Sequence, residues 1–145
     1  MKFPMLFTVK TVVEQGIQTK WGCEKKGLSP IPCSIPHEFG GPGSGYSPED
    51  LFLFSIVSCM LATFKVYCEK SHLQFGKVSC EAAGSLNKDP ASPGGLWIES
   101  ISIAFTVTGA SNVEKVKAAL GKAVADCVIS RSIKSTKEVH ITMMT

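Results

Sequence analysis

Two cysteines, Cys59 and Cys127, are placed where a pair of thiols can do redox chemistry. Cys59 lies in the middle of an apolar segment with a helical pattern, and Cys127 lies on the inward stripe of the other strong helical segment. Thiols on the core-facing sides of two packed helices can form a disulfide if their α-carbons come within about 7 Å. Such a pair can reduce a peroxide, which a single buried thiol does poorly. The alternative is that both thiols only fill space, because cysteine is among the most buried residue types.

The middle of the chain has the pattern of a long central helix. Ser47 suits the N-cap, Pro48 suits the first helical position, and Asp50 completes an S-x-x-[DE] capping box. Residues 51–64 are apolar nearly all round, and the sequence turns polar before Ser71. The pattern predicts a helix that ends near Ser71 and is covered on most sides.

Helical geometry separates the thiols of this segment. Cys59 shares a face with Ile56 and Thr63, whereas Cys68, nine residues further along, points about 180° away from it. The faces that carry Cys59 and Cys127 can therefore meet between two packed helices. For the other cysteines, the interpretation is that they only pack.

Periodicity predicts the remaining elements. The clearest strand covers 98–108, where apolar residues alternate with small or polar ones. The other expected elements, in chain order, are strands at 3–13 and 17–21, loop-rich residues at 22–36, a strand at 77–86, a loop at 87–95, a helix at 112–126 and a strand at 139–143. This order predicts an α+β fold in a single domain covering 1–145, with antiparallel sheets and helices gathered on one face.

The long helix also predicts a partner. One sheet covers only one side of a helix, and residues 51–64 are apolar on nearly every side. A second subunit is then needed to cover the rest, so the sequence predicts a homodimer.

Composition narrows the class of protein. With 44% hydrophobic and 19% charged residues, the chain is expected to be soluble and globular. A net charge of +3, with scattered lysines and one arginine, argues against a nucleic-acid binder, which needs a clustered basic face. No signal peptide is recognised, and the apolar stretch 51–64 is shorter than the roughly 20 residues that span a bilayer, so no membrane partner is expected.

Cysteine usage bears on compartment and metal binding. The chain has six cysteines, no CxxC pair and no recognised export signal, which favours free thiols in a reducing, cytoplasmic compartment. The nearest approach to a metal set is Cys23, Cys33 and His37. Their wide and irregular spacing differs from the tight pairs of structural zinc sites, and no metal or resident cofactor is expected.

The run from Pro36 to Leu73 resembles the OsmC/Ohr family, the osmotically inducible and organic hydroperoxide resistance proteins. The matching residues are Gly40-Gly41, the run from Gly45 to Leu51, and Ser58-Cys59. A second match is the run from Cys127 to Ser130, where the family carries its second cysteine after a helix. Together with the order of elements, the resemblance covers most of the chain.

The resemblance implies a fold and an activity. The family fold is an OsmC-like intertwined homodimer, with antiparallel sheets wrapped around two central helices and active sites at the subunit boundary. Its peroxidase branches reduce organic hydroperoxides in the response to oxidative stress. Carried over, Cys59 is the peroxidatic thiol and Cys127 the resolving thiol, which condenses with the sulfenic acid to a disulfide. An external dithiol, which in the family can be a lipoyl group, resets the pair.

Glu49 is the carboxylate that matches the family motif. On a straight helix it lies about 15 Å from Cys59 along the axis, so it cannot touch that thiol within one chain. A catalytic Glu49 would then serve the partner subunit's Cys59. The alternative is that Glu49 only favours the N-terminal end of the helix dipole.

Two departures from the family pattern concern activation of Cys59. The peroxidase branches carry an arginine that lowers the cysteine pKa, in the Ohr branch from the N-terminal region, and this sequence has none there. Lys10 and Lys20 are the nearby cations, and lysine does not give the bidentate contact of arginine. Arg131 is a candidate substitute and His37 a candidate orienting group. In addition, valine follows Cys127 where the peroxidases usually have proline, so the chain looks like a divergent, OsmC-like branch.

Three hypotheses follow. The first is a thiol peroxidase with an apolar lining suited to alkyl or lipid peroxides, formed by Phe52, Ile56, Met60, Phe64 and Leu120. The second is a non-catalytic dimer that binds a small hydrophobic or thiol-reactive molecule, and it is favoured by a Cys59 pKa of about 8.5 or above. The third is a structural dimer whose cysteines only pack.

Overall fold

The computed structural model describes residue 1 and residues 3–144 of the 145-residue chain. It divides into two compact units, Met1–Leu51 and Phe52–Thr145. That both belong to one domain over 1–145 stays a prediction.

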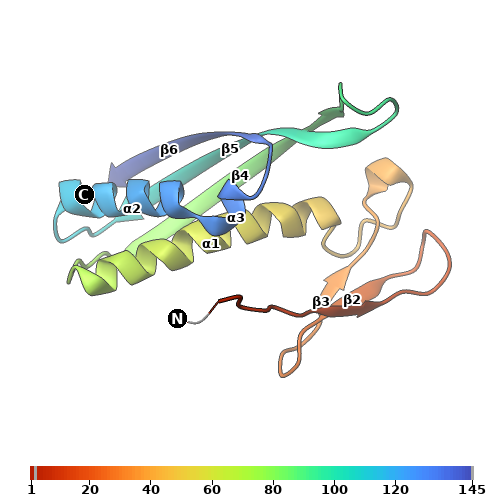
Figure 1. The fold of residues 1–145 in the computed structure, drawn as a ribbon, viewed down its shortest axis with the longest axis horizontal. Coiled ribbons are helices and arrows are strands. Elements are labelled where there is room, and N and C mark those ends of the chain that lie inside the picture. The colour runs from red at the N-terminus through yellow and green to blue at the C-terminus, as the bar shows by residue number, and fades with distance from the viewer. Residues whose placement is uncertain (2, 145) are drawn as a thin grey trace. The chain divides into compact units, whose positions relative to one another are not determined.

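The N-terminal unit contains a small antiparallel sheet in the order β1-β2-β3 (Figure 1). Its strands are β1 (Lys10–Val12), β2 (Trp21–Glu24) and β3 (Ile31–Cys33), and a 3-10 turn, η1 (His37–Phe39), follows. The expected strand at 3–13 is wrong in length, because β1 pairs only with β2 over three residues. The expected return arm at 17–21 is displaced towards β2, and the expected loop 22–36 contains both β2 and β3.

Helix α1 (Pro48–Lys70) begins as the capping box predicts. The Asp50 N–H donates to Ser47 Oγ at 3.1 Å, and the Ser47 N–H donates to Asp50 Oδ2 at 2.9 Å. Two otherwise unsatisfied donors at the helix start are thereby satisfied, which fixes the first residue of the helix.

The C-terminal unit is a three-stranded sheet with helices on one face (Figure 1). Strand β5 (Leu96–Thr108) is central, between β4 (Lys77–Lys88) and β6 (Thr136–Met144). Strand β4 pairs antiparallel with β5, but β6 pairs parallel with it, so the expectation of wholly antiparallel sheets is wrong at β6. The helices α2 (Val113–Asp126) and α3 (Val128–Arg131) lie between β5 and β6 in the sequence. A helical crossover of this kind lets the chain return in the same direction.

The core of this unit lies between α1, α2 and β5. Every fourth residue of α1 is buried there, and so are alternate residues of β5 and one face of α2. From α1 these residues are Ile56, Met60, Phe64 and Cys68; from β5 they are Ile101, Ile103, Phe105 and Val107; from α2 they are Val116, Leu120 and Ala123. Cys68 is therefore on the buried stripe itself, and Cys59 lies beside the stripe and is only partly buried. The expectation that Cys59 is on the core-facing side of the helix is wrong, because Cys68 is the thiol of α1 that is buried in the core.

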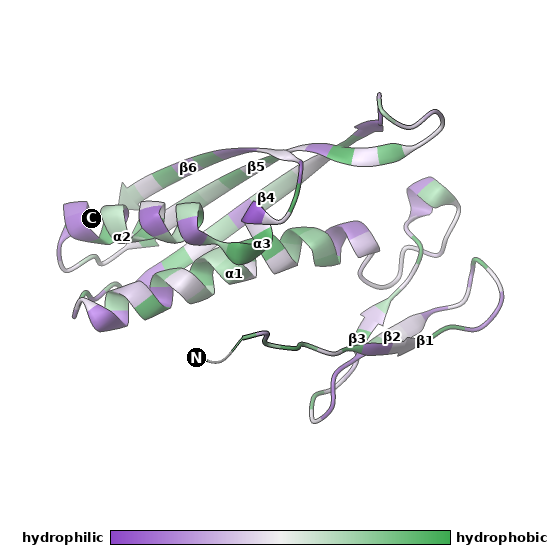
Figure 2. Cartoon of the chain, in the orientation of Figure 1, coloured by the Kyte–Doolittle hydropathy of each residue, from purple (hydrophilic) through white to green (hydrophobic). Residues whose placement is uncertain are grey.

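Helix α1 is longer than the apolar stretch considered from sequence. It has 23 residues, its best window has a mean hydropathy of 1.9, and 22% of that window is buried in the chain. The expectation that this segment is too short to span a bilayer is wrong, because the whole helix is longer than the roughly 20 residues required. Core helices of proteins outside membranes have the same length and composition, so length alone does not decide between the two. Figure 2 shows hydrophobic residues along much of α1.

Candidate active site

Cys59 and Cys127 come together at the junction of α1 with the turn between α2 and α3. The sequence predicted that Cys127 lies on the second helix. In the structure it is instead the residue between α2 and α3, with extended backbone angles φ −61° and ψ 113°. Its side chain is 0% exposed, whereas that of Cys59 is partly exposed. Each of the two thiols shifts the pKa of the other, so the two side chains are close neighbours.

The surroundings of Cys59 favour its thiolate. Burial by itself raises the pKa of Cys59, but backbone N–H groups from the start of α3 act against it. The Ile129 N–H contributes most, followed by the Cys127 thiol and the Val128 N–H. The net result is a Cys59 pKa below its usual value, because hydrogen bonds to the charged form stabilise that form.

Cys127 has the opposite tendency. Burial raises its pKa, the Ser130 N–H lowers it, and the neighbouring Cys59 raises it further. The Cys127 thiol donates to the Ile56 carbonyl oxygen at 3.8 Å, and its sulfur accepts from the Ser130 N–H at 3.4 Å. The net direction is upward, so of the two thiols Cys59 ionises first and Cys127 keeps its proton.

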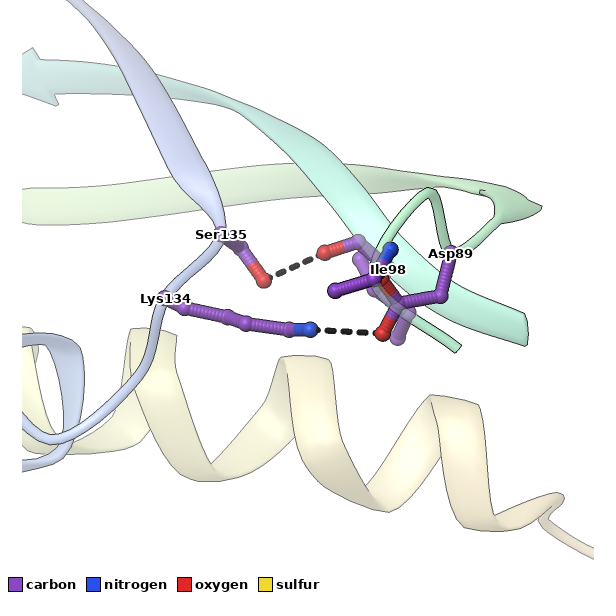
Figure 3. Close-up of polar contacts among 5 residues, drawn as sticks. Asp89, Ile98, Lys134 and Ser135 are labelled. Atoms are coloured by element: carbon purple, nitrogen blue, oxygen red, sulfur yellow. Dashed lines mark hydrogen bonds and ion pairs between the residues drawn. The ribbon is translucent and has the colours of Figure 1, made fainter. Parts of the chain in front are cut away.

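The segment that follows α3 is fixed to the sheet (Figure 3). Lys134 Nζ lies 2.8 Å from Asp89 Oδ2, and the Ser135 hydroxyl donates to the Ile98 carbonyl oxygen at 2.5 Å. Lys134 also lies 4.4 Å from the ring centroid of Trp97. These contacts hold the end of the connection between α3 and β6.

Arg131 and His37, the candidate substitute for the arginine and the candidate orienting group, have contacts away from Cys59. Arg131 is exposed at the end of α3, and its effect is to lower the pKa of Asp126, after the larger effects of Lys122 and Tyr67. The His37 ring lies 3.2 Å from the Gly41 carbonyl oxygen, within its own loop. Among the described residues, those that lower the Cys59 pKa are backbone or neutral groups, so this lowering needs no arginine.

Glu49 lies in the first turn of α1, in the N-terminal unit. Its Oε2 atom is buried and has no hydrogen-bond partner among the described residues. A buried carboxylate oxygen without a hydrogen-bond partner costs free energy. A helix-dipole role alone explains the position of Glu49 but not this unsatisfied oxygen.

The expected apolar lining is mostly core. Four of its five members, Ile56, Met60, Phe64 and Leu120, are each 0% exposed, and only Phe52 is partly exposed. These four side chains pack in the core with residues of β5 and α2, so they do not form the lining that was expected for a substrate. A groove of about 540 Å³ lies elsewhere, between α1 and the β4–β5 edge; it is lined by Leu61, Phe64, Phe75, Val78 and Thr106, among others, and neither Cys59 nor Cys127 borders it.

Comparison with known proteins identifies the family. Residues 41–142 match the family model described as OsmC-like protein. The chain belongs to the OsmC-like protein family. The uncharacterized protein YmaD of Bacillus subtilis is 27% identical over 113 residues, which cover 74% of this OsmC-like protein and 73% of YmaD.

Solved structures share the fold. An OsmC-like protein of unknown function from Vibrio cholerae has a TM-score of 0.76 at 19% identity, covering 94% of this chain and 99% of that chain. The organic hydroperoxide resistance protein OhrB of Bacillus subtilis has a TM-score of 0.68 at 20% identity, covering 97% and 100%. At these identities the likeness shows that this OsmC-like protein has the family's α+β fold.

Sequence reasoning selected the two thiols but missed the groups that act on Cys59. The Val128 and Ile129 donors are backbone N–H groups, which every residue except proline carries, so no side-chain pattern marks them. The C-x-x-S run pointed to the right segment. A signal was available in Val128 itself, because a valine supplies an N–H that the proline expected at this position does not.

Proposed function

We propose that this OsmC-like protein is a thiol-dependent peroxidase that reduces organic hydroperoxides in the response to oxidative stress, with Cys59 as the peroxidatic and Cys127 as the resolving thiol. The observation that carries the proposal is the position of Cys127 between the Ile56 carbonyl oxygen of α1 and the Ser130 N–H of α3, next to Cys59; the opposite directions of the two pKa shifts agree with it. A nucleophilic thiolate and a protonated neighbour are the two species that the reaction requires. Solved structures of the same fold include proteins named for organic hydroperoxide resistance, which agrees with this role.

In the proposed first step, the Cys59 thiolate attacks the outer oxygen of the hydroperoxide. The O–O bond breaks, Cys59 becomes a sulfenic acid, and the alkoxide leaves as an alcohol after taking a proton. In the second step the sulfur of Cys127 attacks the sulfenic sulfur, and water leaves. The pair loses two electrons in total and ends as a Cys59–Cys127 disulfide.

An external dithiol completes the proposed cycle. One of its thiolates attacks the disulfide, and its second thiol displaces the remaining protein sulfur, so that both cysteines are reduced and the dithiol becomes a cyclic disulfide. A lipoyl group is a reductant of this kind. No resident cofactor is needed for these steps.

The non-catalytic binder is less well supported. That hypothesis depended on the missing arginine and on a Cys59 pKa at or above its free value. The Ile129 and Val128 N–H groups supply a substitute for the arginine, and the pKa of Cys59 is shifted downward despite partial burial. A site that only bound apolar ligands would have no need of this arrangement.

We also propose the intertwined homodimer of the family for this chain. In the N-terminal unit, Leu6, Phe7 and Val9 are more than four-fifths exposed, at 87%, 81% and 83%. In the C-terminal unit, Val66 on α1 is 48% exposed. Apolar side chains in such number are commonly covered by another subunit. Sedimentation velocity on the purified protein should give the mass of two chains, and a monomer would contradict this assembly.

In that dimer we propose that Glu49 acts with the partner subunit's Cys59. Its buried and unsatisfied Oε2 would accept a proton or a hydrogen bond from the bound hydroperoxide or its alcohol product. Glu49→Gln keeps the shape of the side chain and removes the charge, so it should slow turnover more than it changes stability. The cytoplasmic location and the absence of nucleic-acid and membrane partners stay predictions.

The deciding experiment measures both the consumption of peroxide and the identity of the disulfide that forms. Reduced protein is mixed with one equivalent of cumene hydroperoxide, and the products are mapped by mass spectrometry after digestion. We expect a disulfide that joins Cys59 to Cys127, and continuous peroxide consumption once dihydrolipoamide is added. Cys59→Ser should remove both results, because a serine hydroxyl is not ionised at neutral pH.

A Cys68→Ser variant is the matched control, since Cys68 is a buried thiol of the same helix with a pKa raised by burial. It should retain turnover. Full turnover in Cys59→Ser, or no disulfide in the parent protein, would overturn the peroxidase proposal.

A further inference from the structure

A second pair of thiols lies in the N-terminal unit. Cys33 Sγ is 3.4 Å from Cys23 Sγ, and both residues are free cysteines. They lie on neighbouring antiparallel strands, β2 and β3. Sequence reasoning treated both as packing residues, and the proposed peroxidase cycle uses neither.

The strand register explains why the two sulfurs are close. Cys23 is opposite Ile31 and Cys33 is opposite Trp21, so the cysteines are diagonal neighbours, two residues out of register. Residues with this relation lie on the same face of the sheet. Their side chains can therefore meet, even though the residues are ten apart in the sequence.

The backbone around Cys33 is held from both sides. Cys33 pairs with β2 on one side and forms a parallel bridge with Tyr46 on the other. The neighbouring Ser34 N–H donates to the Tyr46 carbonyl oxygen at 3.2 Å. A Cβ on Gly45 would lie 2.8 Å from the Cys33 carbonyl carbon, so glycine is required for this close approach. The backbone of Cys33 is thus fixed beside β2, where its sulfur lies 3.4 Å from that of Cys23.

The two thiols differ in access. Cys33 is 1% exposed, whereas Cys23 is partly exposed. Burial raises the pKa of Cys33, and the neighbouring Cys23 raises it further. A reagent in solution therefore meets Cys23 first, and Cys33 is placed to attack whatever forms on the Cys23 sulfur.

We propose that Cys23 and Cys33 form a second redox-active dithiol, which exchanges with small-molecule disulfides and closes a reversible cross-link between β2 and β3. The Cys23 thiolate attacks one sulfur of the small disulfide, and one small thiolate leaves. The Cys33 thiolate then attacks the Cys23 sulfur, and the second small thiolate leaves. Two protein thiols lose two electrons and two protons, and the small disulfide becomes two thiols.

The diagonal register also predicts that the cross-link is readily reversed. Diagonal α-carbons in a sheet are about 7–8 Å apart, which is beyond the usual span of a disulfide. Closing the bond requires β3 to move towards β2, and that cost favours the reduced pair. The site is accordingly a responsive pair and not a permanent structural bond. A metal is a poorer fit, because no group of three His, Cys, Asp or Glu side chains suited to a metal occurs in the described part of the chain.

The test uses the full-length chain with Cys59→Ser and Cys127→Ser, so that the outcome is independent of the proposed peroxidase. Reduced protein is equilibrated in glutathione buffers of increasing disulfide content, acid-quenched and alkylated. Trypsin together with a glutamate-specific protease then leaves Cys23 in residues 21–24 and Cys33 in residues 27–38, apart from position 59. We expect these two peptides to become disulfide-linked, and the link to disappear on return to reduced glutathione.

Two single substitutions in the same background test the order of attack. In Cys33→Ser, Cys23 should accumulate a stable mixed disulfide with glutathione, because the thiol that displaces it is missing. In Cys23→Ser, Cys33 should stay unmodified, because it is buried. Cys68 and Cys80 serve as internal controls that should remain free. Circular dichroism establishes that each variant is folded.

The proposal would be overturned if no disulfide joined peptides 21–24 and 27–38 in any of the buffers. In that case Cys23 in the folded protein would be either free or only glutathionylated. If this link forms, and the parent protein with all six cysteines fails to consume hydroperoxide, the second dithiol is supported while the peroxidase proposal is removed.

Discussion

The two thiol pairs of this protein have similar side chains but different surroundings. Cys59 faces backbone N–H groups from the turn that carries its partner Cys127, and its pKa is lowered. Cys33 faces Cys23 on the neighbouring strand, where burial and the Cys23 thiol outweigh the single backbone N–H of Cys23 that acts against them, so the pKa of Cys33 is raised. In each pair one sulfur is buried and the other is partly exposed.

The difference teaches that proximity and activation are separate properties. Two sulfurs near each other suffice for a disulfide, but attack on a peroxide needs a thiolate at neutral pH. In the pair of Cys59 and Cys127 the chain supplies both conditions. In the pair of Cys23 and Cys33 it supplies proximity alone, which suits slow exchange with disulfides.

The largest expected effect comes from removing the resolving thiol. Cys127→Ser should allow one turnover per chain and then stop, because the sulfenic acid on Cys59 has no partner with which to condense. Steady-state peroxide consumption should fall by at least about 100-fold, and Cys59 should accumulate as sulfinic acid with excess peroxide. Rapid-quench peroxide assays and intact-protein mass spectrometry measure both.

The equivalent substitution in the other pair, Cys33→Ser, should leave turnover unchanged. A comparable loss there would show that the two pairs work in one cycle and would break the comparison.

A smaller effect should follow from removing one backbone donor. Val128→Pro deletes the N–H that contributes to the Cys59 thiolate, at the first position of α3, where proline is compatible with a helix. A hydrogen bond to a charged group is worth about 1.5 kcal/mol or more, so alkylation of Cys59 by iodoacetamide at pH 7 should slow about tenfold.

Val128 is 68% exposed, so Val128→Ala is a suitable control that retains the N–H and should react at the parental rate. Alkylation of Cys23 should be the same in all three proteins. An unchanged Cys59 rate in Val128→Pro would mean that another group sets its pKa.

A stability change of about 1 kcal/mol is expected from the cap of α2, the helix that leads into Cys127. The Asn112 side chain accepts from the Lys115 N–H at 2.9 Å, and Asn112→Ala removes this bond, whereas Asn112→Ser provides another capping oxygen. Urea denaturation should separate the two variants. Exchange at Cys23 and Cys33 should not respond, since those residues lie in the other unit.

The smallest effect concerns Cys80, whose thiol lies 4.0 Å from the Glu81 carbonyl oxygen. Burial, and then Glu81, raises the pKa of Cys80 from 9.0 to about 11. Between these values the unfolded chain ionises and the folded chain does not, so the free energy of unfolding falls as pH rises from 9 to 11. Its partial exposure limits the fall to below about 1 kcal/mol.

Cys80→Ala should flatten this part of the stability profile, measured by urea denaturation at each pH. Cys59 has the opposite sign: its lowered pKa adds stability as pH rises through the folded value, and that stability is lost as pH falls through it. An identical profile in Cys80→Ala would mean that another group controls stability in this range.

Several elements could be predicted from sequence because their causes are local. The Ser47 and Asp50 capping box determined where α1 begins, and both reciprocal hydrogen bonds are present. Alternation determined β5, and the three- and four-residue spacing determined α2. The thiols Cys59 and Cys127 could be selected because the motifs around them are short and contiguous.

Other features depended on contacts between distant segments, which no local pattern encodes. The direction of β6 follows from how the α2–α3 crossover returns to the sheet, and the residues of β6 are equally suited to either direction. The strands β2 and β3 are only four and three residues long, too short for periodicity to reveal. Their register alone brings Cys23 to Cys33.

The sequence by itself determined the family's α+β fold, the start of the central helix and the two thiols to examine. Only the tertiary structure decided which thiol is activated, because the groups that lower the Cys59 pKa are backbone N–H groups placed by the turn after α2. The sequence gives the type of each side chain, but the electrostatic environment of that side chain depends on which distant backbone segments pack against it.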